Sequence, residues 1–400
     1  MSSEELLELT TTGWATGGEA VARGADGRVV FVAGAAADEA VAVELTEARR
    51  SFARGRVVEV RRPSPHRIEP VCAAVAQGCG GCDLAFVDAA GQRAAKRAVV
   101  GDALARLGGV ELDEDRLLDG PDLDRVGFRT TVRGVVVDGR FGFRRRGSHD
   151  AVVPASCRVA HPSVQELLVD GRFEGAAEVQ VRVGAATGER MVVVDGPREG
   201  VSVPADVVVV TTAELAAGRR AWIHEEVADH RFRISADAFF QTRRDGAAAL
   251  VELVRAAVDG AGTMVDLCSG VGLFAATSGA AKVVAVESNR SAVADARINL
   301  AGLGPRARIV RTRFESWRPS AAEVVVADPA RAGLGRAGVT ALVATGAERV
   351  VLVSCDAASL GRDVGLLVES GYRPRDVTLV DLFPDTSHVE AVTVLDRVVP

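Results

Sequence analysis

The chain has 400 residues, enough for about two or three domains with buried cores. A hydrophobic content of 48% fits a compact soluble protein, and no apolar run approaches the roughly 18 residues of a membrane span. The N-terminus, MSSEELLELT, lacks the basic and apolar regions of a signal peptide. We therefore expect a cytoplasmic protein without a membrane partner, whose six cysteines are ligands or catalysts rather than disulfides.

Arginines gather in two stretches of the chain. The net charge of −6, taken alone, argues against a nucleic-acid partner. Yet seven arginines in residues 49–67 face one acid, Glu59, and seven in residues 125–146 face only Asp138. Such patches predict contact with RNA, although solvated strand faces in an arginine-biased chain would give the same pattern.

The first 62 residues read as short strands separated by glycine turns, with a hairpin signal at Asp26-Gly27. About five strands in this length predict an OB-like barrel over 1–62, and RRPSP at 61–65 reads as a linker. Residues 63–230 mix a helical stretch at 91–107 with strand patterns, which predicts an α+β central domain. Those strand patterns lie at 129–137, 140–144, 178–183 and 190–194.

Over residues 231–400 helices alternate with β-rich runs, which predicts a doubly wound parallel sheet. A helix is expected at 291–300, and the last two segments, 376–382 and 390–397, read as strands with a short connection. A parallel sheet closed by such a terminal hairpin is typical of the Rossmann-like class I methyltransferase fold. The parallel strands are expected at 264–267, 283–286, 308–310, 324–327 and 350–354.

A strand, a glycine turn and a helix follow one another in VDLCSGVGLF (265–274). Gly270 and Gly272 let the backbone approach a ligand, and Glu287 ends the next strand, where an acid can grip a ribose diol. The third glycine of a dinucleotide motif is missing, because Ala275 stands there. The pattern favours a nucleoside cofactor such as S-adenosylmethionine, and Asp328 adds another acid at the same edge.

A cysteine ends the apolar run VVLVS (350–354), and a second strand pattern ending near Glu390 would supply a carboxylate close by. The alternatives are a small buried thiol at Cys355 and a surface carboxylate on an edge strand at Glu390. His388 is expected to be structural. Phe239 and Phe240 either stack on a base or belong to the core.

Four further cysteines, Cys72, Cys79, Cys82 and Cys157, lie outside the C-terminal region. The tight turn CGGC (79–82) allows a loop to wrap around a metal or cluster. Four thiolates suit zinc and a 4Fe-4S cluster equally by spacing. The spacing of radical S-adenosylmethionine enzymes, Cys-x-x-x-Cys-x-x-Cys, is absent.

Over nearly its whole length the chain resembles the RNA uridine-5-methyltransferases, and its N-terminal barrel resembles their TRAM domain. The matching pieces are FFQTR (239–243), DLCSGVG (266–272), VES (286–288), DPARAGL (328–334), VSCDAASLGRD (353–363) and FPDTSHVE (383–390). Two departures stand out. The family often has an aromatic residue at the position of Cys268 and an asparagine near Leu273, and DPARAG lacks the lysine of the usual DPPRKG.

The resemblance implies that Cys355 is the nucleophile and Glu390 the base, and that a 4Fe-4S cluster is held by the four other cysteines, as in the subset of these enzymes with a CGGC pattern. It favours 23S ribosomal RNA as substrate and a monomer. Alternatives are transfer RNA and an inactive RNA-binding iron–sulfur protein. Cytosine-5 methylation is disfavoured, because Ala330 stands where a cysteine would follow Asp-Pro. The implied cofactor or base contacts are Gln241, Asp266, Cys268, Gly270, Gly272, Leu273, Glu287 and Asp328.

Overall fold

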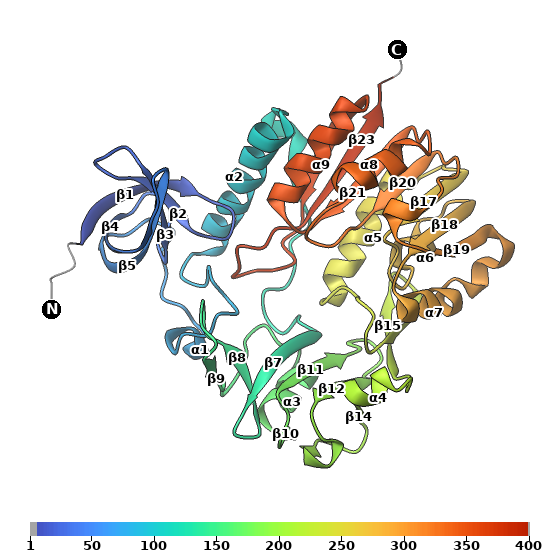
Figure 1. Ribbon diagram of the computed structural model, residues 1–400, viewed down its shortest axis with the longest axis horizontal. Helices are drawn as coiled ribbons and strands as arrows, with labels where there is room; N and C mark the ends of the chain where they lie inside the picture. The colour runs from blue at the N-terminus through green and yellow to red at the C-terminus, as the bar shows by residue number, and fades with distance from the viewer. Residues whose placement is uncertain (1–5, 399–400) are drawn as a thin grey trace.

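The computed structural model describes residues 6–398. Figure 1 shows a small N-terminal barrel standing beside a large C-terminal sheet, with a smaller sheet of the middle section below them. Within the described residues, no helix is long and apolar enough to cross a membrane.

The N-terminal strands close into a barrel in the order β1-β2-β3-β5-β4, which confirms the expected OB-like architecture. Small apolar side chains alternate inward along these strands, among them Ala20, Val32 and Val41, which are fully buried. The expected linker starts later than predicted, because Arg61 and Arg62 still belong to β5. The strands are β1 (Leu7–Trp14), β2 (Ala20–Arg23), β3 (Val29–Ala33), β4 (Ala40–Ala48) and β5 (Phe52–Arg62).

Barrel closure neutralises much of the first arginine stretch. Counting only the acid within residues 49–67 is the wrong measure of the net charge on this surface, because acids from other parts of the barrel pair with these arginines. Arg67, for example, binds the fully buried Glu39 at 2.5 Å. The other pairs include Arg54 with Glu19, Arg56 with Glu44, and Arg61 with Glu8 and Glu59.

The middle section forms a sheet in the order β14-β12-β11-β7-β8-β9, with the expected strands in place. Two small antiparallel pairs, β10–β13 and β15–β16, were not predicted. The strands are β7 (Thr131–Val137), β8 (Arg140–Arg144), β9 (Ala151–Val152), β10 (Arg172–Phe173), β11 (Glu178–Val183), β12 (Arg190–Asp195), β13 (Val201–Ser202), β14 (Val208–Thr211), β15 (Trp222–Val227) and β16 (His230–Ser235). The short helices here are α1 (Ala73–Ala76), α3 (Pro162–Val169) and α4 (Thr212–Ala216).

The C-terminal strands form one sheet in the order β19-β18-β17-β20-β21-β23-β22-β6. The first five of these strands are parallel and match the expected positions to within one residue at either end. They are β17 (Thr263–Leu267), β18 (Lys282–Glu287), β19 (Ala307–Arg311), β20 (Val324–Ala327) and β21 (Arg349–Ser354). The remaining strands are β22 (Tyr372–Leu379), β23 (Ala391–Arg397) and β6 (Leu117–Asp119).

Helices cover both faces of this sheet, which explains its almost continuous apolar strands. One face packs against α5 (Arg244–Val258), α6 (Leu273–Thr277) and α7 (Arg290–Asn299). The other face packs against α2 (Ala89–Gly108), α8 (Gly335–Val343) and α9 (Ala357–Glu369). Two elements of the 63–230 section, α2 and β6, therefore belong structurally to the C-terminal sheet.

Two expectations about the last strands need correction. The penultimate strand ends at Leu379 rather than at 382, so the connection to β23 spans residues 380–390 and is not short. No strand ends near Glu390; this residue instead immediately precedes β23, which lies inside the sheet between β21 and β22. Glu390 is only 3% exposed, so the alternative of a surface carboxylate on an edge strand is wrong.

Glycines let α2 and α9 approach closely. A Cβ atom at Gly361 of α9 would overlap the carbonyl oxygen of Ala103 in α2, and one at Gly108 of α2 would lie 2.7 Å from the carbonyl oxygen of Gly361. Figure 1 shows the two helices side by side. The sequence thus ties the middle section to the C-terminal sheet through a backbone contact.

We expect Gly361→Ala to lower the free energy of unfolding by about 2 kcal/mol, because the added methyl group forces two helix backbones apart. Urea denaturation would measure the change. Gly101→Ala in α2 is the matched control: a Cβ there meets nothing within 4 Å, so higher helix propensity should leave stability unchanged or slightly raised. Equal effects of the two substitutions would contradict the close packing.

Candidate active site

The functional side chains follow the order of the sheet along one edge. Neighbouring strands β18, β17 and β20 place Glu287, Asp266 and Asp328 at their carboxyl ends. The same edge continues with Cys355 after β21 and Glu390 before the antiparallel β23. Residues separated by more than a hundred positions in sequence thus share the edge at which open α/β sheets bind ligands.

Cys355 and Glu390 face each other across two paired strands. Ser354 of β21 pairs with Ala391 of β23, and extending this antiparallel register by one residue places Cys355 opposite Glu390. Opposed residues in such a pair have Cα atoms about 4.5–5.5 Å apart. A thiol and a carboxylate therefore border the same small space.

The acidic groups at this edge raise one another's pKa. Burial, followed by the carboxylates of Glu390 and Asp328, raises the pKa of the Cys355 thiol to about 11, and Arg331 opposes this rise. Burial and then the charge of Asp328 raise the pKa of Glu390 well above its ordinary value. Desolvation raises the pKa of Asp328 to about 7. Burial and mutual repulsion therefore favour the neutral form of both carboxyl groups, and a carboxylate with a raised pKa accepts a proton more readily than an ordinary one.

Gln241 and Asp328 form a polar pair beside the thiol. The Nε2 of Gln241 donates to an oxygen of Asp328 at 3.4 Å, and Gln241 is 7% exposed. Asp328 therefore keeps lone pairs for another donor. An amide and a carboxyl group fixed together can recognise a planar ring that carries both donors and acceptors.

The glycine loop between β17 and α6 is shaped for a ligand. Gly272 caps α6 with φ of 92°, a conformation suited to glycine, and a Cβ at Gly270 would meet open space. The buried Asp266 accepts from the N–H of Ala275 at 2.8 Å through one oxygen, while its other oxygen has no partner. The hydroxyl of Ser269 is also buried without a partner. Two orphaned polar atoms beside an open glycine loop fit a polar ligand.

Glu287 is held in a fixed orientation next to this loop. One of its oxygens accepts from the N–H of Gly270 at 2.9 Å, and the other from the N–H groups of Ser288 and Asn289 at 2.6 and 2.7 Å. A carboxylate oxygen with one hydrogen bond still has a free lone pair, so the position suits a ribose hydroxyl.

Two of the expected contact residues have other surroundings. The side chain of Leu273 lies in the core at 6% exposure, so a ligand contact would come from its backbone. Cys268 adopts a left-handed φ of 66°, and burial together with the carboxylates of Glu287 and Asp328 raises its pKa strongly. The pKa of Cys355 is raised for the same reasons, so pKa does not separate the two thiols; Cys355 differs in lying opposite Glu390.

The two phenylalanines have separate environments. Phe240 is 7% exposed and packs on Phe232 at 5.7 Å between ring centroids, so it belongs to the core. Phe239 is 64% exposed. The ring of His388 packs against the ring of Phe383, with 5.8 Å between their centroids. The Nε2 atom of His388 lies 3.3 Å from a terminal nitrogen of Arg331.

Sequence reasoning missed the residues that anchor the loop before Glu390. The buried Lys96 of α2 donates to Asp381 at 2.7 Å and to the carbonyl oxygen of Phe383 at 2.9 Å. Arg125 binds both Asp381 and Asp385, at 3.0 and 2.9 Å. These partners are more than 250 positions apart, and no local pattern in the sequence marks them.

The segment after Cys82 holds the same loop. The N–H of Ser387 donates to Asp83 at 2.9 Å, and the N–H of Leu84 donates to the carbonyl oxygen of Asp385 at 2.9 Å. The cysteine-rich part of the chain is thus in direct contact with the loop that leads to Glu390.

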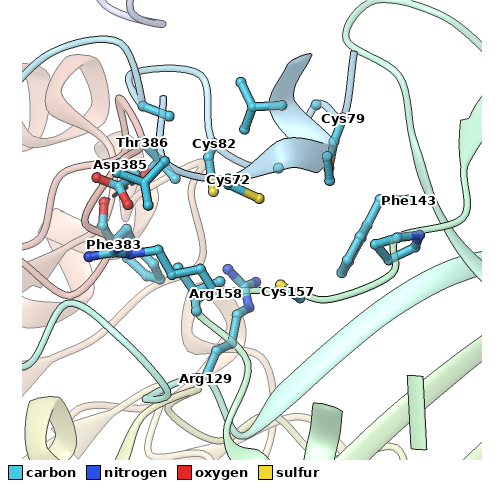
Figure 2. A pocket seen from close by; sticks show the side chains of 18 of the residues that line it. Cys72, Cys79, Cys82, Arg129, Phe143, Cys157, Arg158, Phe383, Asp385 and Thr386 are labelled. Carbon is cyan, nitrogen blue, oxygen red and sulfur yellow. Dashed lines mark hydrogen bonds between the residues drawn. The ribbon is translucent and has the colours of Figure 1, made fainter. Parts of the chain in front are cut away.

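The four remaining cysteines border one cavity of about 400 Å³. Figure 2 shows Cys157 on the side opposite the segment that carries Cys72, Cys79 and Cys82. Burial, then Asp385, then the other thiols raise the pKa of Cys82 to about 12. Within residues 6–398, no group of three or more His, Cys, Asp or Glu side chains is already close enough together to hold a metal ion. The donor set and its shared cavity nevertheless fit a thiolate-bound group.

The fold and this edge define a class I methyltransferase. Residues 5–58 match the TRAM domain family. An uncharacterized RNA methyltransferase of Streptomyces coelicolor is 35% identical over 98% of this chain and 93% of that relative. One of Thermosynechococcus vestitus is 33% identical over 97% of each. The chain therefore belongs to this family of RNA methyltransferases.

A solved structure shares the whole architecture. The Pyrococcus abyssi tRNA (uracil-54, C5)-methyltransferase, in complex with S-adenosyl-L-homocysteine, superposes with a TM-score of 0.75 over 97% of this chain and 99% of that one. At 22% sequence identity, this likeness shows the fold.

Proposed function

We propose that the protein methylates C5 of uridine in RNA, with S-adenosylmethionine as methyl donor and 23S ribosomal RNA as the favoured substrate. The observation that carries the proposal is the position of Cys355 and Glu390, one residue beyond the Ser354–Ala391 pair of β21 and β23. Asp328 and Gln241 lie beside them. A thiol opposite a buried carboxylate supplies the two groups that this reaction requires.

The chemistry follows from these positions. C5 of uracil is a poor nucleophile, so the thiolate of Cys355 adds to C6 and pushes an electron pair toward C5. C5 then bonds to the methyl group, and the sulfur of the donor leaves with the electron pair of the broken bond. Glu390 takes the C5 proton, and the electron pair released expels the Cys355 thiolate. The base must be flipped out or already unpaired to reach the thiol.

S-adenosylmethionine would supply an activated methyl group. The orphaned oxygen of Asp266, the open backbone at Gly270 and the fixed carboxylate of Glu287 support its binding at the glycine loop. Gln241 and Asp328 would hold the uracil ring next to it. Transfer of a labelled methyl group to uridine-containing RNA, with 5-methyluridine identified by mass spectrometry, tests this function directly.

Transfer RNA is the second candidate substrate, since the structural neighbour is described as a tRNA methyltransferase. The ribosomal assignment depends on the four-cysteine set. Mapping 5-methyluridine in ribosomal and transfer RNA from a strain lacking the gene separates the two, because only the true substrate loses the modification.

We propose further that segments 1–62 and 63–230 bind RNA while 231–400 carries catalysis, in a monomer. Cys72, Cys79, Cys82 and Cys157 would hold a 4Fe-4S cluster with a structural or RNA-orienting role. Their shared cavity and the contact of Asp83 with Ser387 support such a role. With all four irons ligated by thiolates, no open iron would be left for a substrate.

We expect anaerobically purified wild-type protein to be brown, and Cys82→Ser to lose the visible absorbance and most of the iron, because a four-thiolate site then lacks a ligand. Iron analysis and absorbance spectra check this. Cys355→Ser, outside the set, should keep both. A colourless wild-type protein with stoichiometric zinc would overturn the iron assignment.

A further inference from the structure

The cavity beside the cysteines is also lined by five arginines and a histidine whose pKa is lowered by burial and by Arg331. These are Arg125, Arg129, Arg133, Arg158, Arg331 and His388. Among the described residues that line it, Asp385 is the one carboxylate. Figure 2 shows Arg129 and Arg158 on the same side of the cavity as Cys157.

Most of this positive charge is unpaired within the described part of the chain. Arg125 binds Asp385 and Asp381, which accounts for the carboxylate of the cavity. Arg129 donates through Nε to the carbonyl oxygen of Thr131 at 3.1 Å, and Arg331 approaches only the ring of His388. No carboxylate in residues 6–398 lies within ion-pair distance of Arg129, Arg133, Arg158 or Arg331.

Guanidinium groups gathered in one cavity repel one another unless an anion lies between them. A tetrahedral anion with several oxygens matches the planar, multiple donors of arginine. The unpaired arginines of this cavity therefore have the chemistry of a phosphate site.

Two residues that line the cavity, Arg331 and His388, lie next to the catalytic edge, and the charge of Arg331 acts on the Cys355 thiol. Arg331 follows β20 three residues after Asp328, and His388 lies two residues before Glu390. A nucleotide whose base enters the space between Cys355 and Glu390 has its backbone outside that space. Arg331 and His388 lie between that space and the other arginines of the cavity, so the backbone would pass along them.

We propose that Arg129, Arg133, Arg158 and Arg331 bind backbone phosphates of RNA nucleotides next to the target uridine. The inference rests on the proposed function and locates its RNA substrate. A cysteine-bound cluster is a second source of negative charge, but Arg133, Arg158 and Arg331 are exposed to solvent, which favours an incoming ligand.

The test is the salt dependence of binding to a synthetic RNA stem-loop with a uridine in its loop, followed by fluorescence anisotropy. Each lost contact with a single-stranded phosphate should make the slope of log K against log salt shallower by about 0.7, so Arg133→Gln/Arg158→Gln should change it by about 1.4. The double lysine variant keeps the charge and should keep most of the slope. Arg308→Gln, an exposed arginine on edge strand β19, should bind as wild type.

An unchanged slope in the double glutamine variant would overturn the proposal. The same holds if that variant loses the visible absorbance of the cluster while its slope stays at the wild-type value, since the arginines then serve the cysteine site. If the slope falls as expected but wild-type protein forms no 5-methyluridine, the phosphate site stands and the proposed function fails.

Discussion

Replacing Cys355 with alanine will reduce methyl transfer to RNA by a factor of about 10⁴ or more. Without a thiolate at C6, C5 of uracil lacks the electron density to attack the methyl group. The remaining groups, Gln241 and Asp328, can hold the ring but cannot activate it. Single-turnover transfer of a labelled methyl group from S-adenosylmethionine to RNA measures the loss.

The same variant should still fold and bind RNA. The thiol is partly exposed at a strand end, and its removal leaves no large cavity. Thermal unfolding and stem-loop affinity should therefore match those of wild type. Undiminished methylation by Cys355→Ala would show that this cysteine does not add to the base.

Buried parallel strands were the most predictable part of the fold. A strand covered on both faces must be apolar throughout, as in the segment Val324–Ala327, and such runs are bounded sharply by polar or glycine residues. The hairpin of β15 and β16 was missed, because His224, Glu225 and Glu226 interrupt its apolar pattern. Glu225 is nevertheless buried, where it accepts from the N–H groups of Ala185 and Ala186. Because these hydrogen bonds join residues far apart in the sequence, no pattern around Glu225 predicts that its side chain is buried.

The site was predictable where it lies on strand ends and unpredictable where it depends on register. The glycine loop and Glu287 follow from the alternation of strands and helices. The opposition of Cys355 and Glu390 instead depends on β23 entering the sheet between β21 and β22 and starting at Ala391. Reading 390–397 as a strand gave the right element but placed Glu390 inside it, and a shift of one residue would turn the side chain to the other face.

The anchoring of the 380–390 connection shows the same limit. Lys96 and Gln92 of α2 form hydrogen bonds with this connection. The helical pattern of 91–107 did not predict these contacts. Their polar groups are buried because Asp381 and Asp385, nearly three hundred residues away, satisfy them. The second arginine stretch contains both paired and unpaired members for the same reason.

Glu390→Gln will trap the enzyme on its substrate. Methyl transfer needs only the thiolate and the donor, so the ring should still be methylated. The C5 proton then has no base, and the bond between Cys355 and C6 cannot break. A protein–RNA band that survives denaturing electrophoresis should accumulate toward one RNA per protein, while turnover falls by a factor of about 10²–10⁴.

Glutamine suits this test because it matches glutamate in shape at a position that is 3% exposed. The band should require S-adenosylmethionine and vanish in Cys355→Ala/Glu390→Gln. Glu369→Gln, an exposed carboxylate at the end of α9, should turn over as wild type and leave no band. Normal turnover by Glu390→Gln would move the role of base to Asp328, the neighbouring carboxyl group whose pKa of about 7 also suits proton removal.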